Sequence, residues 1–192
     1  MDYAGILHKP WHKTVYWFRI PERLEGRCKI GDRVLCVTAR GLTEGNIHIL
    51  LQGISEGDAD EFITSQYNLN ASPLRSEIVA VAERIPLENI KVDDELIESC
   101  RLSSEELNKK LAEYEKHKRF PELPYVVDGV MVKGYDVYQI CRALAMWDVP
   151  VFVLQPEVEE FERRNILRRL LCLRKAGRAD CGTEGERRQS LG

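Results

Sequence analysis

The sequence predicts an α+β fold, in which a small N-terminal β-barrel is followed by an α/β module and a C-terminal basic helix. Short β-forming segments joined by glycine turns fill the first part of the chain, as is typical of small barrels. Helical and strand patterns then alternate, and a segment rich in arginine and leucine follows. The predicted divisions are a barrel (14–84), an α/β module (85–155), a basic amphipathic helix (156–176) and a disordered tail (177–192).

The composition is that of a soluble globular protein. Of 192 residues, 44% are hydrophobic and 31% are charged. The formal net charge is −3, so any contact with nucleic acid must come from a local basic patch. The first eleven residues lack the apolar core of a signal peptide, and no apolar run is long enough to span a bilayer. We therefore expect a cytoplasmic protein without membrane contact.

The cysteines and histidines do not predict a metal site. None of the six cysteines forms a CxxC pair, so neither a zinc framework nor a redox motif is expected. His8 and His12 are four residues apart, but Pro10 between them disfavours the helix that would bring them together. Residues 1–13 are expected to form a loose or docking lead-in.

Four segments of the N-terminal part are predicted to be strands. Their spacing and glycine turns indicate a small barrel or a curled sheet, of which the barrel is favoured. A polar, acidic stretch at 53–72 is expected to be an exposed loop. The predicted strands are 15–20, 33–38, 46–54 and 77–85, with a turn at Gly31-Asp32 before the second of them. The phrase at 30–34, followed by Gly41 and Gly45, resembles the small barrel that begins the PriA helicase. Such barrels serve as scaffolds, bind protein partners or contact nucleic acid, and the scaffold or partner-binding role is favoured here.

The order of elements in the second half resembles the ParB/sulfiredoxin-like superfamily. Ser103 and the carboxylates after it predict a helix start, and Asp128-Gly129 predicts the turn of a hairpin. Three phrases account for the resemblance: 85–92, 126–129, and 134–144 followed by 148–151. The resemblance implies an extended segment, a helix, the hairpin, a second helix and a closing strand, with Val151 and Val153 of that strand buried.

The resemblance also implies a phosphate-binding turn before the second helix. In the family this turn contains a glycine, two variable residues and an arginine that forks onto the phosphate. Here Gly134 is kept, but valine occupies the arginine position at Val137 and Asp136 adds negative charge. We therefore expect an eroded site. Its candidate nucleotide or phosphate contacts are Asp128, Lys133, Gly134, Tyr135 and Asp136. No cofactor is expected with certainty, and a nucleotide with Mg²⁺ is the candidate.

A cluster of carboxylates follows the opening strand, where some relatives place a catalytic group. Asp94 and Glu95 could act as a base, because repulsion between neighbouring carboxylates raises one pKa. The alternative is an acidic segment that caps the next element, and this alternative is favoured.

The C-terminal segment 162–178 contains the strongest local charge. Its arginines could contact phosphates, or they could pair with the acidic remainder of the protein. The candidate nucleic-acid contacts are Arg163, Arg164, Arg168, Arg169, Arg174 and Lys175.

These observations together predict a non-catalytic binding protein. By analogy of fold, its ligand is nucleic acid or a nucleotide-bearing complex in a replication, partition or mobile-element setting. A small-molecule phosphotransferase that uses Asp94 or Glu95 is one alternative, and a protein-interaction adaptor is another.

Overall fold

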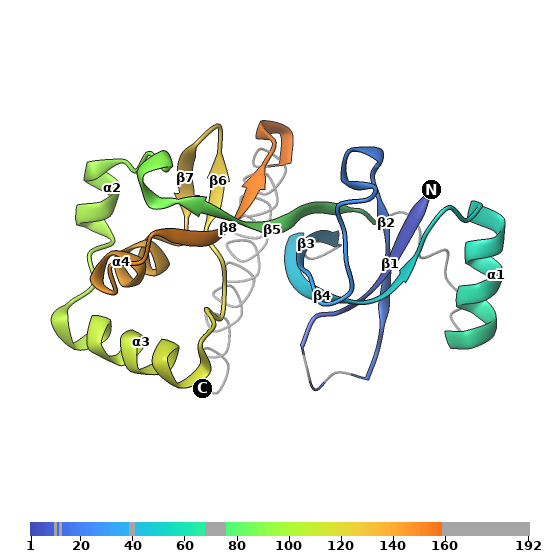
Figure 1. Cartoon of the computed structure of the whole chain (residues 1–192), viewed down its shortest axis with the longest axis horizontal. Coiled ribbons are helices and arrows are strands. Elements are labelled where there is room, and N and C mark those ends of the chain that lie inside the picture. The colour runs from blue at the N-terminus through green and yellow to red at the C-terminus, as the bar shows by residue number, and fades with distance from the viewer. Residues whose placement is uncertain (10, 12, 39–40, 68–75, 159–192) are drawn as a thin grey trace, which may run out of the picture.

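The computed structural model describes residues 1–9, 11, 13–38, 41–67 and 76–158. They form an α+β fold around one open, mixed sheet with the strand order β2-β1-β4-β3-β5-β8-β6-β7 (Figure 1). Of the strand ladders among the described residues, that of β6 with β8 is parallel and the others are antiparallel. The strands are β1 (Asp2–Leu7), β2 (Tyr16–Ile20), β3 (Arg33–Thr38), β4 (Gly41–Leu51), β5 (Ile78–Pro86), β6 (Tyr125–Val127), β7 (Val130–Lys133) and β8 (Asp148–Leu154). Short 3-10 turns occur at Glu22–Leu24 and Leu87–Asn89.

The prediction of a closed N-terminal barrel is wrong, because its strands belong to the open sheet. The strands β2, β1, β4, β3 and β5 curl, and within the described residues β2 approaches the start of β5 through an isolated bridge between Arg19 and Glu77, the residue before β5. Pro21 follows β2 and lacks an N–H, so the bridge cannot extend past it in that direction. The predicted strands nevertheless exist, and β4 begins earlier than expected, at Gly41.

Two N-terminal segments differ from their predictions. Asp2–Leu7 is the buried strand β1, which pairs with both β2 and β4 rather than forming a loose lead-in. Glu56–Tyr67 is the helix α1 rather than an exposed loop. Ala59 and Ile63, one helical turn apart, are fully buried against Tyr3 and Trp17 of the strands. So few buried apolar residues do not give the sequence pattern by which an amphipathic helix is predicted.

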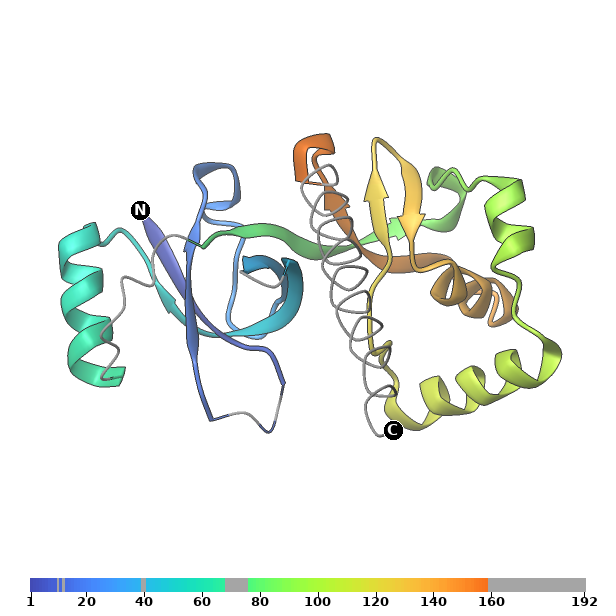
Figure 2. The ribbon, with the colours of Figure 1, turned by 180° about the vertical axis from the view of Figure 1, so that it is seen from behind.

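The strand β5 joins the two halves of the molecule. Its first part, Ile78–Val81, pairs with β3, and its second part, Ala82–Pro86, pairs with β8. Figures 1 and 2 show this strand running through both halves. The predicted boundary between residues 84 and 85 falls inside this strand.

The C-terminal half has the predicted order of elements, with one additional helix. The helices are α2 (Asp94–Ser99), α3 (Ser104–His117) and α4 (Tyr135–Ala143). Ser103 caps α3 as expected, and Ala145, with a φ of 50°, follows the end of α4. The hairpin of β6 and β7 turns at Asp128-Gly129. Val151 is buried, as expected, whereas Val153 is 38% exposed because alternate residues of a strand face opposite sides of the sheet.

The described part of the C-terminal segment is short. Residues 156–158 are helical, and the rest of the predicted basic helix and tail lies outside the described residues. Among the described residues, no helix has both the length and the apolar character needed to cross a membrane.

Candidate functional site

The turn before α4 has the backbone shape that the predicted phosphate site requires. Gly134 has φ 88° and ψ 31°, and a Cβ at this position would lie 2.6 Å from Cα of Pro124. Both the left-handed conformation and the close approach favour glycine. The strand β7 therefore ends at Lys133, and α4 begins at Tyr135 with its first amides open to one side.

A cavity of about 520 Å³ opens beside this turn. It brings together four of the predicted contacts, Lys133, Gly134, Tyr135 and Asp136. It also contains residues that sequence reasoning missed, because they come from other parts of the chain. These are Cys100, Lys110, Pro121, Glu122 and Leu123.

The carboxylate of Asp136 is already paired within the protein. Lys110 Nζ, from α3, donates to Asp136 Oδ2 at 2.8 Å. This hydrogen bond is the main reason that the pKa of Lys110 is raised above its ordinary value. The pair places a negative group at the N-terminus of α4, where the resemblance places a phosphate.

The other predicted contacts of the turn also have partners. Tyr135 donates its hydroxyl to the carbonyl of Met131 at 2.9 Å, and burial raises its pKa. Lys133 Nζ lies 3.3 Å from Glu122 and 4.7 Å from the ring centroid of Tyr125. Val137, at the family's arginine position, is only 4% exposed. Its side chain is part of the core, so an arginine at this position would have to point in a different direction from the valine.

The remaining predicted contacts are not part of this cavity. Asp128 is exposed at the hairpin turn, at the opposite end of β7 from Gly134. Asp94 and Glu95 lie exposed in the first turn of α2, outside the lining of the cavity. Asp93 caps that helix by accepting from the amides of Glu95 at 2.9 Å and Leu96 at 3.3 Å. The acidic segment therefore caps the next helix, which is the arrangement that the sequence analysis favoured over a catalytic role.

The predicted nucleic-acid contacts lie beyond the described residues. They are Arg163, Arg164, Arg168, Arg169, Arg174 and Lys175. Within the described ranges, no group of three or more His, Cys, Asp or Glu side chains is placed to hold a metal ion.

A second hollow, which sequence reasoning missed, lies between the two halves. This groove of about 590 Å³ is lined by the loop between β1 and β2, by β4, and by the C-terminal end of α3. Its polar and aromatic lining includes His8, Lys9, Trp11, His117, Arg119 and Lys133. The signal was present as two short basic runs, 8–13 and 116–119, which only the folded chain brings together.

Comparisons with known proteins give one distant structural match. No known family model and no curated protein matches the sequence. Among solved structures, a Pnob8-like ParB-N domain is similar to this chain, with 16% sequence identity and a TM-score of 0.34. The match covers 45% of this chain and 34% of that one. The chain thus has a distant structural resemblance to a ParB-N domain.

Proposed function

We propose that the chain is a non-catalytic, ParB-like binding protein whose ligand is nucleic acid, acting in the cytoplasm. The observation that supports a non-catalytic role is the pair between Lys110 and Asp136 at the turn before α4. A phosphotransferase of the kind that the sequence resembles would hold phosphates at this turn. Here the carboxylate of Asp136 lies at the start of the helix, where a phosphate would be favoured, and it is paired with Lys110.

The arrangement of the carboxylates outside the cavity also favours binding over catalysis. A general base must reach the reacting group within hydrogen-bond distance, directly or through one water. Asp94 and Glu95 are exposed on α2 and do not line the cavity beside Gly134. They are therefore poorly placed to act on a substrate held at that turn.

Calorimetric titration with ATP and Mg²⁺ tests this proposal. The unmodified protein should give no binding heat, because Lys110 is engaged by Asp136 and valine occupies the position of the family's phosphate-binding arginine. Asp136→Ala should release Lys110 and give measurable affinity. Asp94→Ala removes an exposed carboxylate outside the cavity and serves as the matched control, with no gain expected. Tight binding of ATP by the unmodified protein would contradict the proposal. No gain in Asp136→Ala would show that the pair with Lys110 is not what prevents ATP from binding.

One observation favours a protein-interaction adaptor as the second candidate. Trp147 is 69% exposed and lines a hollow of about 620 Å³ with Leu87, Tyr138 and Met146. Exposed tryptophan beside apolar side chains is typical of protein contact sites. This hollow lies on the C-terminal half, away from the residues that line the groove between the halves.

A further inference from the structure

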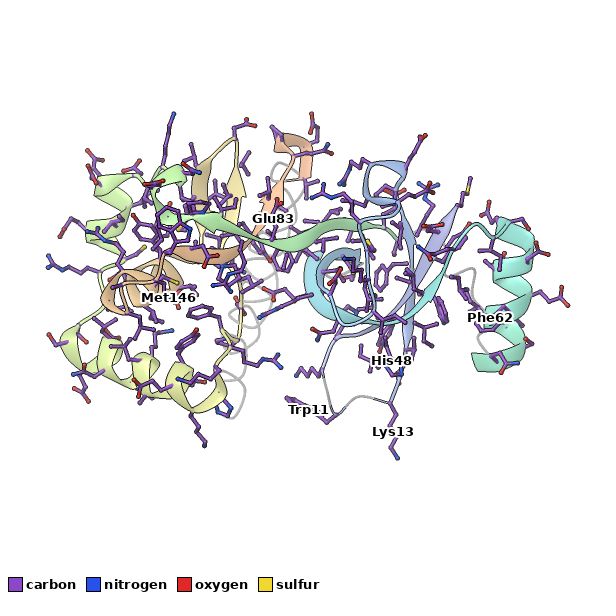
Figure 3. The ribbon with its side chains drawn as sticks, viewed as in Figure 1. Trp11, Lys13, His48, Phe62, Glu83 and Met146 are labelled. Atoms are coloured by element: carbon purple, nitrogen blue, oxygen red, sulfur yellow. The ribbon has the colours of Figure 1, made fainter. Side chains whose placement is uncertain are left out.

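The groove between the two halves joins basic residues from distant parts of the sequence. Lys9 and Trp11 come from the loop between β1 and β2, whereas His117 and Arg119 come from the end of α3. All four side chains are exposed. Figure 3 shows Trp11 and Lys13 on the loop at the lower edge of the N-terminal half, with Trp11 directed toward the C-terminal half.

The charge of the groove is positive in spite of the acidic chain. Three of the described lining residues are acids, and two of these form ion pairs with cations of the protein. Glu44 forms an ion pair with Arg33, and both side chains are less than one-fifth exposed. Glu122 lies 3.3 Å from Lys133. Among the described residues of the lining, this leaves the acid Glu113 opposite the cations Lys9 and Arg119, so the groove attracts the phosphates of a nucleic acid.

Trp11 adds a flat aromatic surface at the side of this groove. Its exposed fraction is 74%, the largest of the exposed large hydrophobic residues described. Lys9 Nζ lies 5.6 Å from the centroid of its ring. A tryptophan beside a cation suits a nucleobase and its phosphate, because the ring stacks on the base while the cation meets the charge.

An unpaired base fits this combination better than a duplex. In a double helix both faces of each base are already stacked, and only its edges are presented in the grooves. Single-stranded nucleic acid, by contrast, is bound by basic channels with aromatic stacking surfaces. We propose that this groove binds a single strand of nucleic acid, with Trp11 stacking on a base and with Lys9 and Arg119 contacting phosphates. The inference rests on the proposed function and names its site and ligand class.

Fluorescence anisotropy with the full chain and labelled 15-nucleotide oligo-dT and oligo-rU tests this assignment. Lys9→Glu with Arg119→Glu should abolish most binding at low salt. The control, Lys29→Glu with Lys109→Glu, makes the same change in net charge at exposed positions outside the groove. It should retain most of the affinity. Milder Ala replacements at Lys9 and Arg119 should lower the slope of log affinity against log salt by about 1.4, since each single-strand phosphate contact contributes about 0.7.

The stacking contact has its own matched pair of variants. Trp11→Ala should weaken single-strand binding at least fivefold, as expected for a stacked base worth about 1–3 kcal/mol. Trp147→Ala removes the other highly exposed tryptophan among the described residues, and it should leave binding unchanged. A duplex of the same length should bind more weakly than either single strand.

The results separate this inference from the proposed function. In one outcome, single strands bind with an affinity that the groove variants do not change, and Arg168→Glu with Arg169→Glu abolishes binding. The contact then belongs to the predicted basic helix, and the assignment of the groove as the binding site is overturned. Equal binding of duplex with no effect of Trp11→Ala would overturn the single-strand assignment alone. If no nucleic acid binds at low salt while poly-glutamate does, both are overturned in favour of an acidic protein partner.

Discussion

At the scale of single residues, Gly134 fixes the shape of the turn before α4. Replacing it by alanine should destabilise the protein by at least about 2 kcal/mol, because the left-handed backbone and the overlap with Pro124 both oppose a Cβ. Urea unfolding measures the change.

Two controls separate the effect of the backbone conformation from that of the overlap. Gly26→Ala has a similar φ of +73° but open space around the added Cβ, and Gly57→Ala has neither a positive φ nor a nearby atom. Gly26→Ala should cost less than Gly134→Ala, and Gly57→Ala should be neutral or slightly stabilising. Equal effects at all three glycines would contradict the argument.

At the scale of elements, α3 depends on a capping box at its start. Glu106 N–H donates to Ser103 Oγ at 3.3 Å, and Glu106 Oε2 accepts from the amide of Ser103 at 2.9 Å. Ser103→Ala should cost about 1 kcal/mol in urea unfolding, whereas Ser104→Ala, one residue into the helix, should change little.

The cost of Ser103→Ala should also depend on pH. The hydrogen bond from Ser103 holds the pKa of Glu106 below its ordinary value. The stabilisation is therefore complete above the ordinary glutamate pKa and disappears as the pH falls through the lowered one. The difference between Ser103→Ala and the unmodified protein should shrink in acid, and a constant difference would contradict the coupling.

At the scale of the whole molecule, a semi-buried ion pair ties the curled N-terminal strands to the C-terminal half. Arg33 of β3 pairs with Glu44 of β4 and donates to the carbonyl of Phe120 at 2.7 Å. Glu44 accepts from the amide of Leu123 at 3.0 Å. Burial raises the pKa of Glu44, and its hydrogen bonds with Leu123 and Arg33 oppose that rise. The pair therefore joins two strands to the segment that leads into β6.

Breaking this pair from one side should be costly. Arg33→Met leaves Glu44 poorly compensated and should destabilise the protein by about 3 kcal/mol. Arg33→Met with Glu44→Leu should cost much less, and a double-mutant cycle in urea measures the coupling. The exposed pair Arg84–Asp148 is the control, since Arg84→Met should change stability little. A cost at Arg33 no larger than at Arg84 would contradict this role.

Local patterns in the sequence determined much of the C-terminal half. The Ser103 cap, the Asp128-Gly129 turn, the start of α4 at Gly134 and the closing strand each depend on neighbouring residues, so the sequence alone predicts them. The N-terminal strands β2, β3, β4 and β5 were predicted for the same reason.

Tertiary structure decided what depends on distant contacts. Closure of a barrel requires a long ladder between β2 and β5, and local pattern contains no information on that pairing. β1 is a strand because it lies between β2 and β4, and α1 is held by contacts with those strands. The pairing of Lys110 with Asp136 spans 26 residues, and the two basic runs of the groove are separated by about a hundred. Side chains this far apart in the chain are brought together only by the fold.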